Sequence, residues 1–366
     1  MQRFKSILVG IDEEPDSGEV IGQAVDLARR NESRVTLVRT ISELPPDGKK
    51  QLATEMSAEN GGLVLNLIDD WPPATDPPLT PLQPEIRREP QAGREPESAA
   101  QPCLPPAVLI RDRVVSEESR RLERWVGIVR QGGIQANGKI LYGTPFLQII
   151  REVLRNGHDL VMTTAQRRSN LRERLFGSLT VHLMYKCPCP VWVVKPAQPE
   201  CRTRILAAVD PSPHDHERQA LNVKIMDLAT SLARLEQRKL VVVHAWTFLV
   251  ERSLRTGHAS LSTDDVDRWV SDAREQHRRW LIDLLRPYAL EELEHEVYPL
   301  KGEAGHLIPE LATTKEVKLI VMGTVSRTGV AGLLIGNTAE KILGHVDCGV
   351  LAVKPDGFVT PVRLDE

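Results

Sequence analysis

The chain has 366 residues, of which 41% are apolar and 27% are charged, as is ordinary for a globular protein with room for two domains. Its 47 lysines and arginines nearly balance its 50 aspartates and glutamates, so the net charge of −3 predicts binding to neither nucleic acid nor a membrane surface. The sequence lacks the run of about 20 apolar residues that spans a membrane, the apolar region of a signal peptide and the paired cysteine spacing of a zinc site, so we expect a cytoplasmic protein.

Short apolar runs alternate with helical patterns through the first half of the chain. Residues 5–41 contain an apolar run that ends at Asp12, a Pro-containing turn, a helical pattern and a second apolar run. A helix, a strand and another helix are predicted next, at about 116–131, 135–142 and 144–156. Residues 159–196 close this half with a strand, a loop, a helix and the run VWVVKP. Such alternation is typical of βαβ units and a parallel sheet.

A proline-rich segment interrupts this half at residues 72–106, PPATDPPLTPLQPEIRREPQAGREPESAAQPCLPP. It carries few large apolar side chains, so it buries too little apolar surface to offset the entropy lost on ordering. We expect a disordered insertion between the second strand and the following helix. A docking site for a partner that binds proline-rich segments is the alternative.

The same order of elements returns in the second half. Residues 203–246 repeat the pattern of 5–41, and residues 318–355 repeat that of 159–196. Between them a helix, a strand and a helix are predicted at about 264–286, 295–300 and 304–315. The repeat predicts two tandem five-stranded α/β domains with parallel sheets. We place domain 1 at 1–197, domain 2 at 202–357 and a solvated tail at 358–366.

The last loop of the second half has residues that suit a phosphate group. Gly323 directly follows the strand-like run LIVM, and Gly336-Asn337-Thr338 begins a helical pattern. A helix N-terminus offers unpaired N–H groups and a positive dipole end, and glycine allows close approach or a positive φ. Asn337 or Thr338 could cap this helix or donate to an oxygen. The sequence has no G-x-x-x-x-G-K-[ST] motif and no G-x-G-x-x-G after its first strand.

The spacing G-x2-S-x9-G-N, with the flanking segments VMGTVSRTG, IGNTAEKIL and LAVKP, resembles the G-x2-G-x9-G-[ST] loop of the universal stress protein family. Two such chain ends in tandem resemble the family's two-domain proteobacterial type, and the likeness covers the chain except about 45–115. The resemblance implies an α/β fold with strand order 3-2-1-4-5 in each domain. It also implies domain pairing through the last strands, adenine nucleotide binding and a role in the stress response.

Carried over by position, the resemblance implies an ATP site in the second domain. Asp210 falls where the family places a carboxylate near the ribose or its metal, so it is the candidate ligand for Mg²⁺. The full set consists of Ala208, Asp210, Ala245, Met322, Gly323, Ser326, Gly336, Asn337 and Thr338. Two positions depart from the family pattern: Ser326 replaces a glycine, and Asn337 replaces a serine or threonine.

The first domain lacks the matching residues. Thr164 and Arg167 fall where the two leading glycines belong, and their side chains would crowd a phosphate bound to bare backbone. Asp12 and Gly177 survive, but helix capping explains them equally well. The basic run QRRSNLRER is either a solvated loop or an anion site of another kind. We expect no ATP binding in this domain.

Other polar groupings predict structural roles. His214-Asp215-His216 is expected to be a surface turn rather than a metal site, and Cys187 and Cys189 are expected to be structural thiols. His244 is expected to be a hydrogen-bonded histidine at the edge of the core. We find no catalytic residues and no metal-ligand cluster.

Three functions therefore stay open: a regulatory protein that binds ATP, a scaffold that binds no nucleotide or another metabolite in the sheet crevice, and a slow ATP hydrolase. The terminal runs at 191–195 and 350–354 are apolar edge strands, which would aggregate unless they were paired. We expect them to pair within the chain as a pseudo-dimer, and a homodimer of chains is a further alternative.

Overall fold

A computed structural model describes residues 4–11, 17–41, 106–165, 177–195, 202–256, 262–324 and 336–364. The chain divides into two compact units, of which one comprises residues 1–42 and 121–366 and the other residues 43–120. Most of the smaller unit lies outside the described residues, and with it most of the proline-rich segment 72–106. Of this unit the structure describes only the first part of a helix, so the following account concerns the larger unit.

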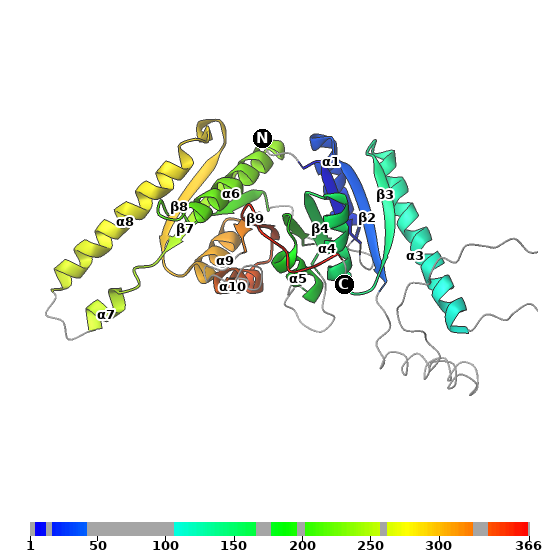
Figure 1. The fold of residues 1–366 in the computed structure, drawn as a ribbon. Helices are drawn as coiled ribbons and strands as arrows, with labels where there is room; N and C mark the ends of the chain where they lie inside the picture. The colour runs from blue at the N-terminus through cyan, green and yellow to red at the C-terminus, as the bar shows by residue number, and fades with distance from the viewer. Residues whose placement is uncertain are drawn as a thin grey trace, which may run out of the picture. The chain divides into compact units, whose positions relative to one another are not determined.

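The first half contains five strands and four helices among its described residues (Figure 1). In chain order they are β1 (Ser6–Gly10), α1 (Ser17–Asn31), β2 (Arg34–Ile41), α3 (Pro106–Gln131), β3 (Ala136–Tyr142), α4 (Pro145–Asn156), β4 (Leu160–Thr164), α5 (Ser178–Lys186) and β5 (Val191–Val194). The helix-strand-helix series predicted in this half is present, with its first helix starting ten residues earlier, at Pro106 rather than 116.

The second half repeats this order. Its elements are β6 (Arg204–Ala208), α6 (His216–Leu235), β7 (Leu240–Trp246), α7 (Glu251–Thr256), α8 (Thr263–Leu285), the 3₁₀ helix η1 (Leu290–Glu292), β8 (His295–Lys301), α9 (Ala304–Thr314), β9 (Val317–Gly323), α10 (Asn337–His345) and β10 (Gly349–Val353). The predicted elements agree with α8, β8 and α9 to within one residue at each end. The short helices α7 and η1 were not predicted.

The ten strands form one sheet, in the order β3-β2-β1-β4-β5-β10-β9-β6-β7-β8. All pairs within a half are parallel, and each half has its strands in the order 3-2-1-4-5. The halves meet where β10 pairs with β5 in antiparallel register, with Leu351 opposite Trp192. The predicted fold class, including the pseudo-dimer built from the two last strands, is confirmed.

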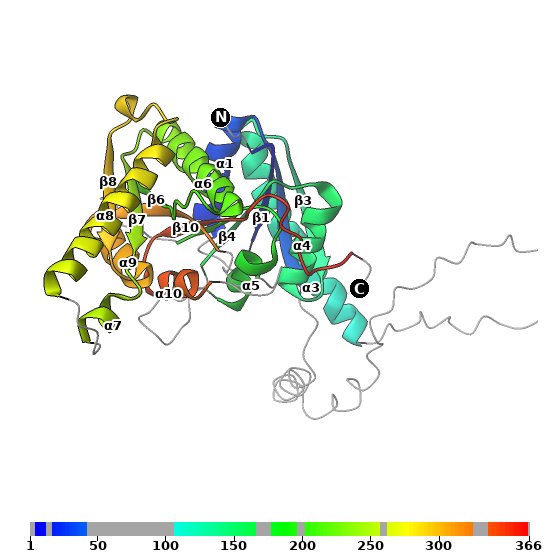
Figure 2. The same ribbon diagram turned by 60° about the vertical axis from the view of Figure 1, so that its left-hand side comes forward.

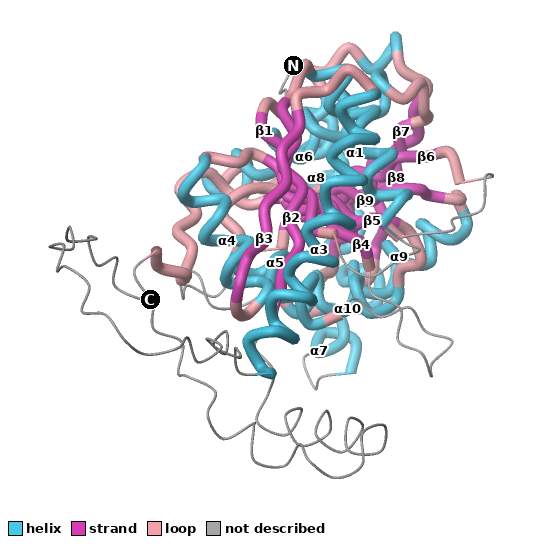
Figure 3. Tube along the Cα trace, turned by 90° about the vertical axis from the view of Figure 1, so that its right-hand side faces the viewer, coloured by secondary structure: helices cyan, strands magenta, loops and turns pink. Residues whose placement is uncertain are grey.

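Helices cover both faces of this sheet, as Figures 2 and 3 show. Side chains of successive strand residues point to opposite faces, so β1 sends Ile7 and Val9 to one apolar cluster and Leu8 to the other. The first cluster includes residues of α1, α3, α6 and α8, and the second includes residues of α4, α5, α9 and α10. Strands buried on both faces explain the almost uninterrupted apolar runs of the sequence. No helix that the structure describes is long and apolar enough to cross a membrane.

The segment after β10 is not simply a solvated tail, contrary to the expectation. Val362 is only 8% exposed and belongs to the second apolar cluster. Nε of Arg151, on α4, donates to the carbonyl of Arg363 at 3.1 Å. The red trace that leaves β10 in Figure 1 accordingly ends beside α4. The C-terminal segment therefore ties the second half to a helix of the first.

Candidate functional site

The carboxyl ends of β6, β7 and β9 form one edge of the second half's sheet. Ala208, at the end of β6, is in register with Met322 on β9 and with Val243 on β7, and Ala245 lies two residues further along β7. Ala208 and Ala245 are partly exposed, whereas Met322 is buried. Because the strands are parallel, three of the predicted nucleotide residues gather at the edge where ligands bind in such sheets.

Asp210 stands at the same edge, two residues beyond β6. Its backbone N–H donates to Oδ1 of Asn222 and its carbonyl accepts from Nδ2 of Asn222, each at 2.9 Å. Its carboxylate lies 3.4 Å from the Arg218 guanidinium, and its side chain is 35% exposed. The first turns of α6 therefore hold this carboxylate in place while leaving part of it open to a ligand.

The motif His214-Asp215-His216 serves mainly to start α6. Asp215 is the N-cap of the helix, and its side chain accepts from the amide of Arg218 at 2.9 Å. The same carboxylate pairs with the Arg218 guanidinium at 3.2 Å. A helix cap accounts for the aspartate, and no group of three metal-binding side chains occurs in the described part of the chain.

Helix α10 points its N-terminus toward this edge. Gly336 is the N-cap, and its amide donates to the carbonyl of Thr324, directly after β9, at 3.4 Å. Of the two roles expected for Asn337 and Thr338, helix capping is excluded, because no side-chain cap bond is formed and both residues are exposed, and donation to a ligand oxygen stays a prediction. Two potential donors at the positive end of the helix dipole thus face outward. Ser326 lies outside the described residues.

Neither described glycine at the ends of this loop, Gly323 or Gly336, has a special backbone conformation. Gly336 has φ −67°, and Gly323 does not have a positive φ either. A Cβ atom on Gly323 would lie 2.7 Å from Cδ2 of Leu221, on α6. Gly323 therefore allows α6 to pack closely against the end of β9, a constraint that exists without any ligand.

A histidine pair that the sequence did not reveal lies beside Asp210. His244, at the end of β7, is completely buried, and its Nδ1 donates to the carbonyl of Val209 at 3.2 Å. Its Nε2 then accepts from Nδ1 of His277, on α8, at 2.9 Å. The His277 ring stacks on Trp246, with centroids 5.0 Å apart. Burial lowers the pKa of His277, and the nearby Asp210 carboxylate acts in the opposite direction. The prediction of a hydrogen-bonded His244 is confirmed.

The structure also brings together a serine, a histidine and a glutamate, but on the opposite edge of the first half. Oγ of Ser6 lies 2.9 Å from Nδ1 of His158, and Nε2 of His158 lies 3.7 Å from Glu152. Ser6 and His158 stand at the amino ends of β1 and β4, Glu152 lies on α4, and all three residues are buried. Burial lowers the pKa of His158, with Glu152 opposing the shift. We interpret the group as a buried structural hydrogen-bond cluster rather than a catalytic triad, because a nucleophile must be reachable by its substrate.

The corresponding edge of the first half differs from the carboxyl edge of the second half. Thr164 ends β4 in the position that Gly323 has in β9, and it is buried, with its carbonyl accepting from Oγ1 of Thr180 at 3.5 Å. Gly177 is the N-cap of α5. Asp12 and Arg167 lie outside the described residues. Absence of ATP binding in this half stays a prediction.

Three cysteines occur in the described residues, and all are free buried thiols. Sγ of Cys187 lies 3.5 Å from Sγ of Cys189, a hydrogen-bond distance rather than a disulfide. Burial raises the pKa of Cys348 to about 12. Buried thiols of this kind are packing groups, and the expected structural role of Cys187 and Cys189 agrees with their burial.

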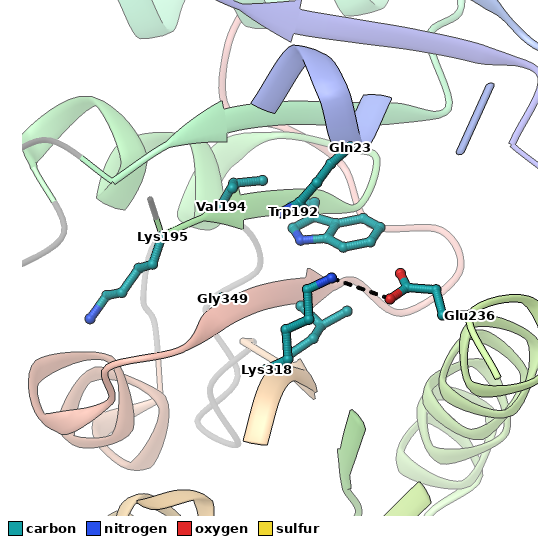
Figure 4. Close-up of a pocket in the computed structure, with 8 residues that line it drawn as sticks. Gln23, Trp192, Val194, Lys195, Glu236, Lys318 and Gly349 are labelled. Carbon is teal, nitrogen blue, oxygen red and sulfur yellow. Dashed lines mark hydrogen bonds and ion pairs between the residues drawn. The ribbon is translucent and has the colours of Figure 1, made fainter. Parts of the chain in front are cut away.

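A small pocket lies at the junction of the two halves rather than at the carboxyl edge of the second half (Figure 4). Its lining consists of Gln23, Trp192, Val194, Lys195, Glu236, Lys318, Leu319 and Gly349. Nζ of Lys318 lies 3.4 Å from the Glu236 carboxylate across it. The cavity volume of about 10 Å³ leaves room for about one water molecule. A nucleotide does not fit there.

Comparison with known proteins agrees with the repeated α/β fold described above. The model of the Universal stress protein family matches residues 3–195 and again 202–354. Universal stress protein E of Escherichia coli K12 is 31% identical over 260 residues, which cover 70% of this chain and 80% of that protein. Universal stress protein E of Photorhabdus laumondii is 23% identical over 99% of both chains.

Among solved structures, a putative universal stress protein from Pseudomonas aeruginosa is similar over 96% of this chain and 94% of its own, with a TM-score of 0.63 and 22% identity. That likeness concerns the fold alone. The family model, however, covers each half almost from end to end, and it does so in the same two segments that the repeat defines. The chain therefore belongs to the universal stress protein family, and its role lies in the response to stress.

Proposed function

We propose that this protein binds an adenine nucleotide, ATP, at the carboxyl edge of the second half. The observation that carries the proposal is the convergence on that edge of Ala208, Ala245, the end of β9 and the outward-facing N-terminus of α10. In this arrangement the two alanines flank the adenine. Gly323 and the first turn of α10 receive the phosphates, which helix N-termini favour.

Asp210 is the residue that would contact the ribose or a Mg²⁺ ion. Mg²⁺ is commonly held by one or two carboxylates together with substrate phosphates, so a single aspartate suits an ion that arrives with its nucleotide. Arg218 already pairs with this carboxylate at 3.4 Å and would compete with the ion. We therefore propose a regulatory binding site with little or no turnover, because one partly neutralised carboxylate gives phosphoryl transfer little assistance.

Asn337→Asp is expected to weaken ATP binding by about tenfold or more, since it sets a negative charge against the phosphates at the first turn of α10. The same charge favours the helix dipole, so the fold should be retained. Calorimetric titration of the full chain with MgATP, at low and at physiological salt, measures the effect. The loss should be larger at low salt because screening is weaker there.

The first half provides a matched control. Ser178 is the first residue of α5, is exposed and follows the N-cap Gly177, as Asn337 follows Gly336 in α10. Ser178→Asp should leave ATP affinity unchanged if only the second half binds. Equal losses in both variants would place a site in each half. Absence of measurable binding to the unmodified chain would refute the proposal and favour a scaffold.

We also propose that the protein acts in the cytoplasm. Its described cysteines, Cys187, Cys189 and Cys348, are all free thiols. Free thiols without disulfides are typical of proteins in a reducing compartment.

A further inference from the structure

Thr324 lies at the base of the proposed nucleotide edge. It directly follows Gly323, the last residue of β9, and it is 1% exposed. Its carbonyl accepts a hydrogen bond from the amide of Gly336, the N-cap of α10. The backbone of Thr324 thus joins the two points where β9 and α10 reach that edge.

The side chain of Thr324 contacts the other half of the molecule. Its Oγ1 donates to the carbonyl of Met184, in the last turn of α5, at 3.2 Å. In a continuing helix that carbonyl would accept from the amide four residues later, but residue 188 is a proline and has no N–H. The threonine hydroxyl therefore supplies the donor that the C-terminus of α5 lacks.

Lys354 determines the direction of this hydrogen bond. Its Nζ, also buried, lies 2.6 Å from Oγ1 of Thr324. An ammonium group can only donate, so the threonine oxygen accepts from Lys354 and must point its own proton elsewhere, toward Met184. Lys354 follows β10, and its charge lies near the negative end of α5, which is favourable for the helix dipole.

The first half does not have an equivalent hydroxyl. Ala165 follows the last residue of β4 in the same way that Thr324 follows the last residue of β9. Lys195, which matches Lys354 in the repeat, donates instead to the carbonyl of Val346 at the end of α10. The hydroxyl bond therefore exists in one direction only. Thr324 of the second half bonds α5 of the first half, whereas Ala165 of the first half has no hydroxyl with which to bond α10.

We propose that Thr324 couples the nucleotide site of the second half to helix α5 of the first half. The inference rests on the proposed function, because it names the element that senses whether the site is filled. ATP that orders Gly323 and Gly336 holds Thr324 in its bonding position and thereby stabilises the last turn of α5. Since coupling between sites is reciprocal, weakening the contact with α5 must also weaken ATP binding.

The test uses hydrogen exchange, followed by mass spectrometry, on the full chain with and without MgATP. In the unmodified protein ATP should slow exchange of the amides in residues 183–187 by about fivefold. Thr324→Val, which keeps the side-chain shape, should speed their exchange without ligand, abolish the effect of ATP and weaken ATP binding by about fivefold. Thr324→Ser keeps the hydroxyl and should behave like the unmodified chain.

Thr313→Val is the matched control, because Thr313 makes the same kind of hydroxyl-to-carbonyl bond, to Pro309 within α9, at 3.0 Å. Protection of α5 by ATP that persists in Thr324→Val, or that is absent from the unmodified chain although ATP binds, would overturn the coupling. Absence of ATP binding to the unmodified chain would overturn the proposed function and the ATP-linked coupling together. The exchange rates of the amides in residues 183–187, compared without ligand between Thr324→Val and the unmodified chain, would then decide whether Thr324 caps α5. If Thr324→Val does not fold, Thr324→Ala provides the same comparison.

Discussion

Trp192→Ala is expected to destabilise the protein by about 3–5 kcal/mol, a large part of the 5–15 kcal/mol that usually separates a folded domain from its unfolded state. Trp192 lies on β5 opposite Leu351 of β10, and it is only 4% exposed. It lines the small pocket between the halves, so its loss would join that pocket to a new cavity at the center of the antiparallel pair. Urea unfolding followed by circular dichroism measures the change.

Trp269 provides the control for this experiment. It has the same side chain but lies on α8 and is 40% exposed. Trp269→Ala should cost about 1 kcal/mol or less, because surface substitutions away from structural features have small effects. If Trp192→Ala costs no more than Trp269→Ala, the β5–β10 pair does not hold the halves together. A second unfolding transition in Trp192→Ala alone would show that the halves still fold but have separated.

The fold could be predicted because its signals are repeated and periodic. Apolar runs such as LIVM at 319–322 mark strands buried on both faces, and each half supplies them in the same order. Pairing of the two last strands was implied by the family resemblance and supported by their apolar character, since an exposed edge of that kind is a liability. Helix α7 escaped prediction because six residues give no periodicity to read. The role of Val362 escaped because one apolar residue in a polar segment carries no pattern.

The candidate site was predictable only in part. The strand ends that carry Ala208, Ala245 and Met322 converge because parallel strands share an edge, and the family resemblance supplied the strand order and these positions. His277 could not be associated with His244, because it lies 33 residues further along the chain, on the mostly exposed helix α8. The reason that a glycine occupies position 323 could not be predicted either, because Gly323 makes room for Leu221, which lies on another element.

Lys354→Met is expected to change the pH dependence of stability. Burial lowers the pKa of Lys354 from its ordinary value of 10.5 to about 8, with the nearby Cys187 opposing the shift. Below pH 8 the amine is protonated in both the folded and the unfolded chain, and the full cost of burying the charge is present. Between pH 8 and 10.5 the folded chain has released the proton that the unfolded chain still binds, so stability rises with pH. A shift of this size corresponds to about 3 kcal/mol.

Methionine has no proton to release, so Lys354→Met lacks this gain. Its stability relative to the unmodified chain should be most favourable at neutral pH and should fall by about 3 kcal/mol as the pH approaches 10.5. The constant part of the difference contains the lost hydrogen bond to Thr324 and the lost contact with the Phe358 ring, so only the change with pH reports the buried charge. Urea unfolding of both proteins at pH 7, 8, 9 and 10 measures that change. Lys239→Met, at a partly exposed lysine paired with Glu294, corrects for the removal of one positive charge from the protein. A stability difference that is the same at every pH would mean that the Lys354 amine is hydrated in the folded protein. The hydrogen bond between Thr324 and α5 would then also be accessible to water.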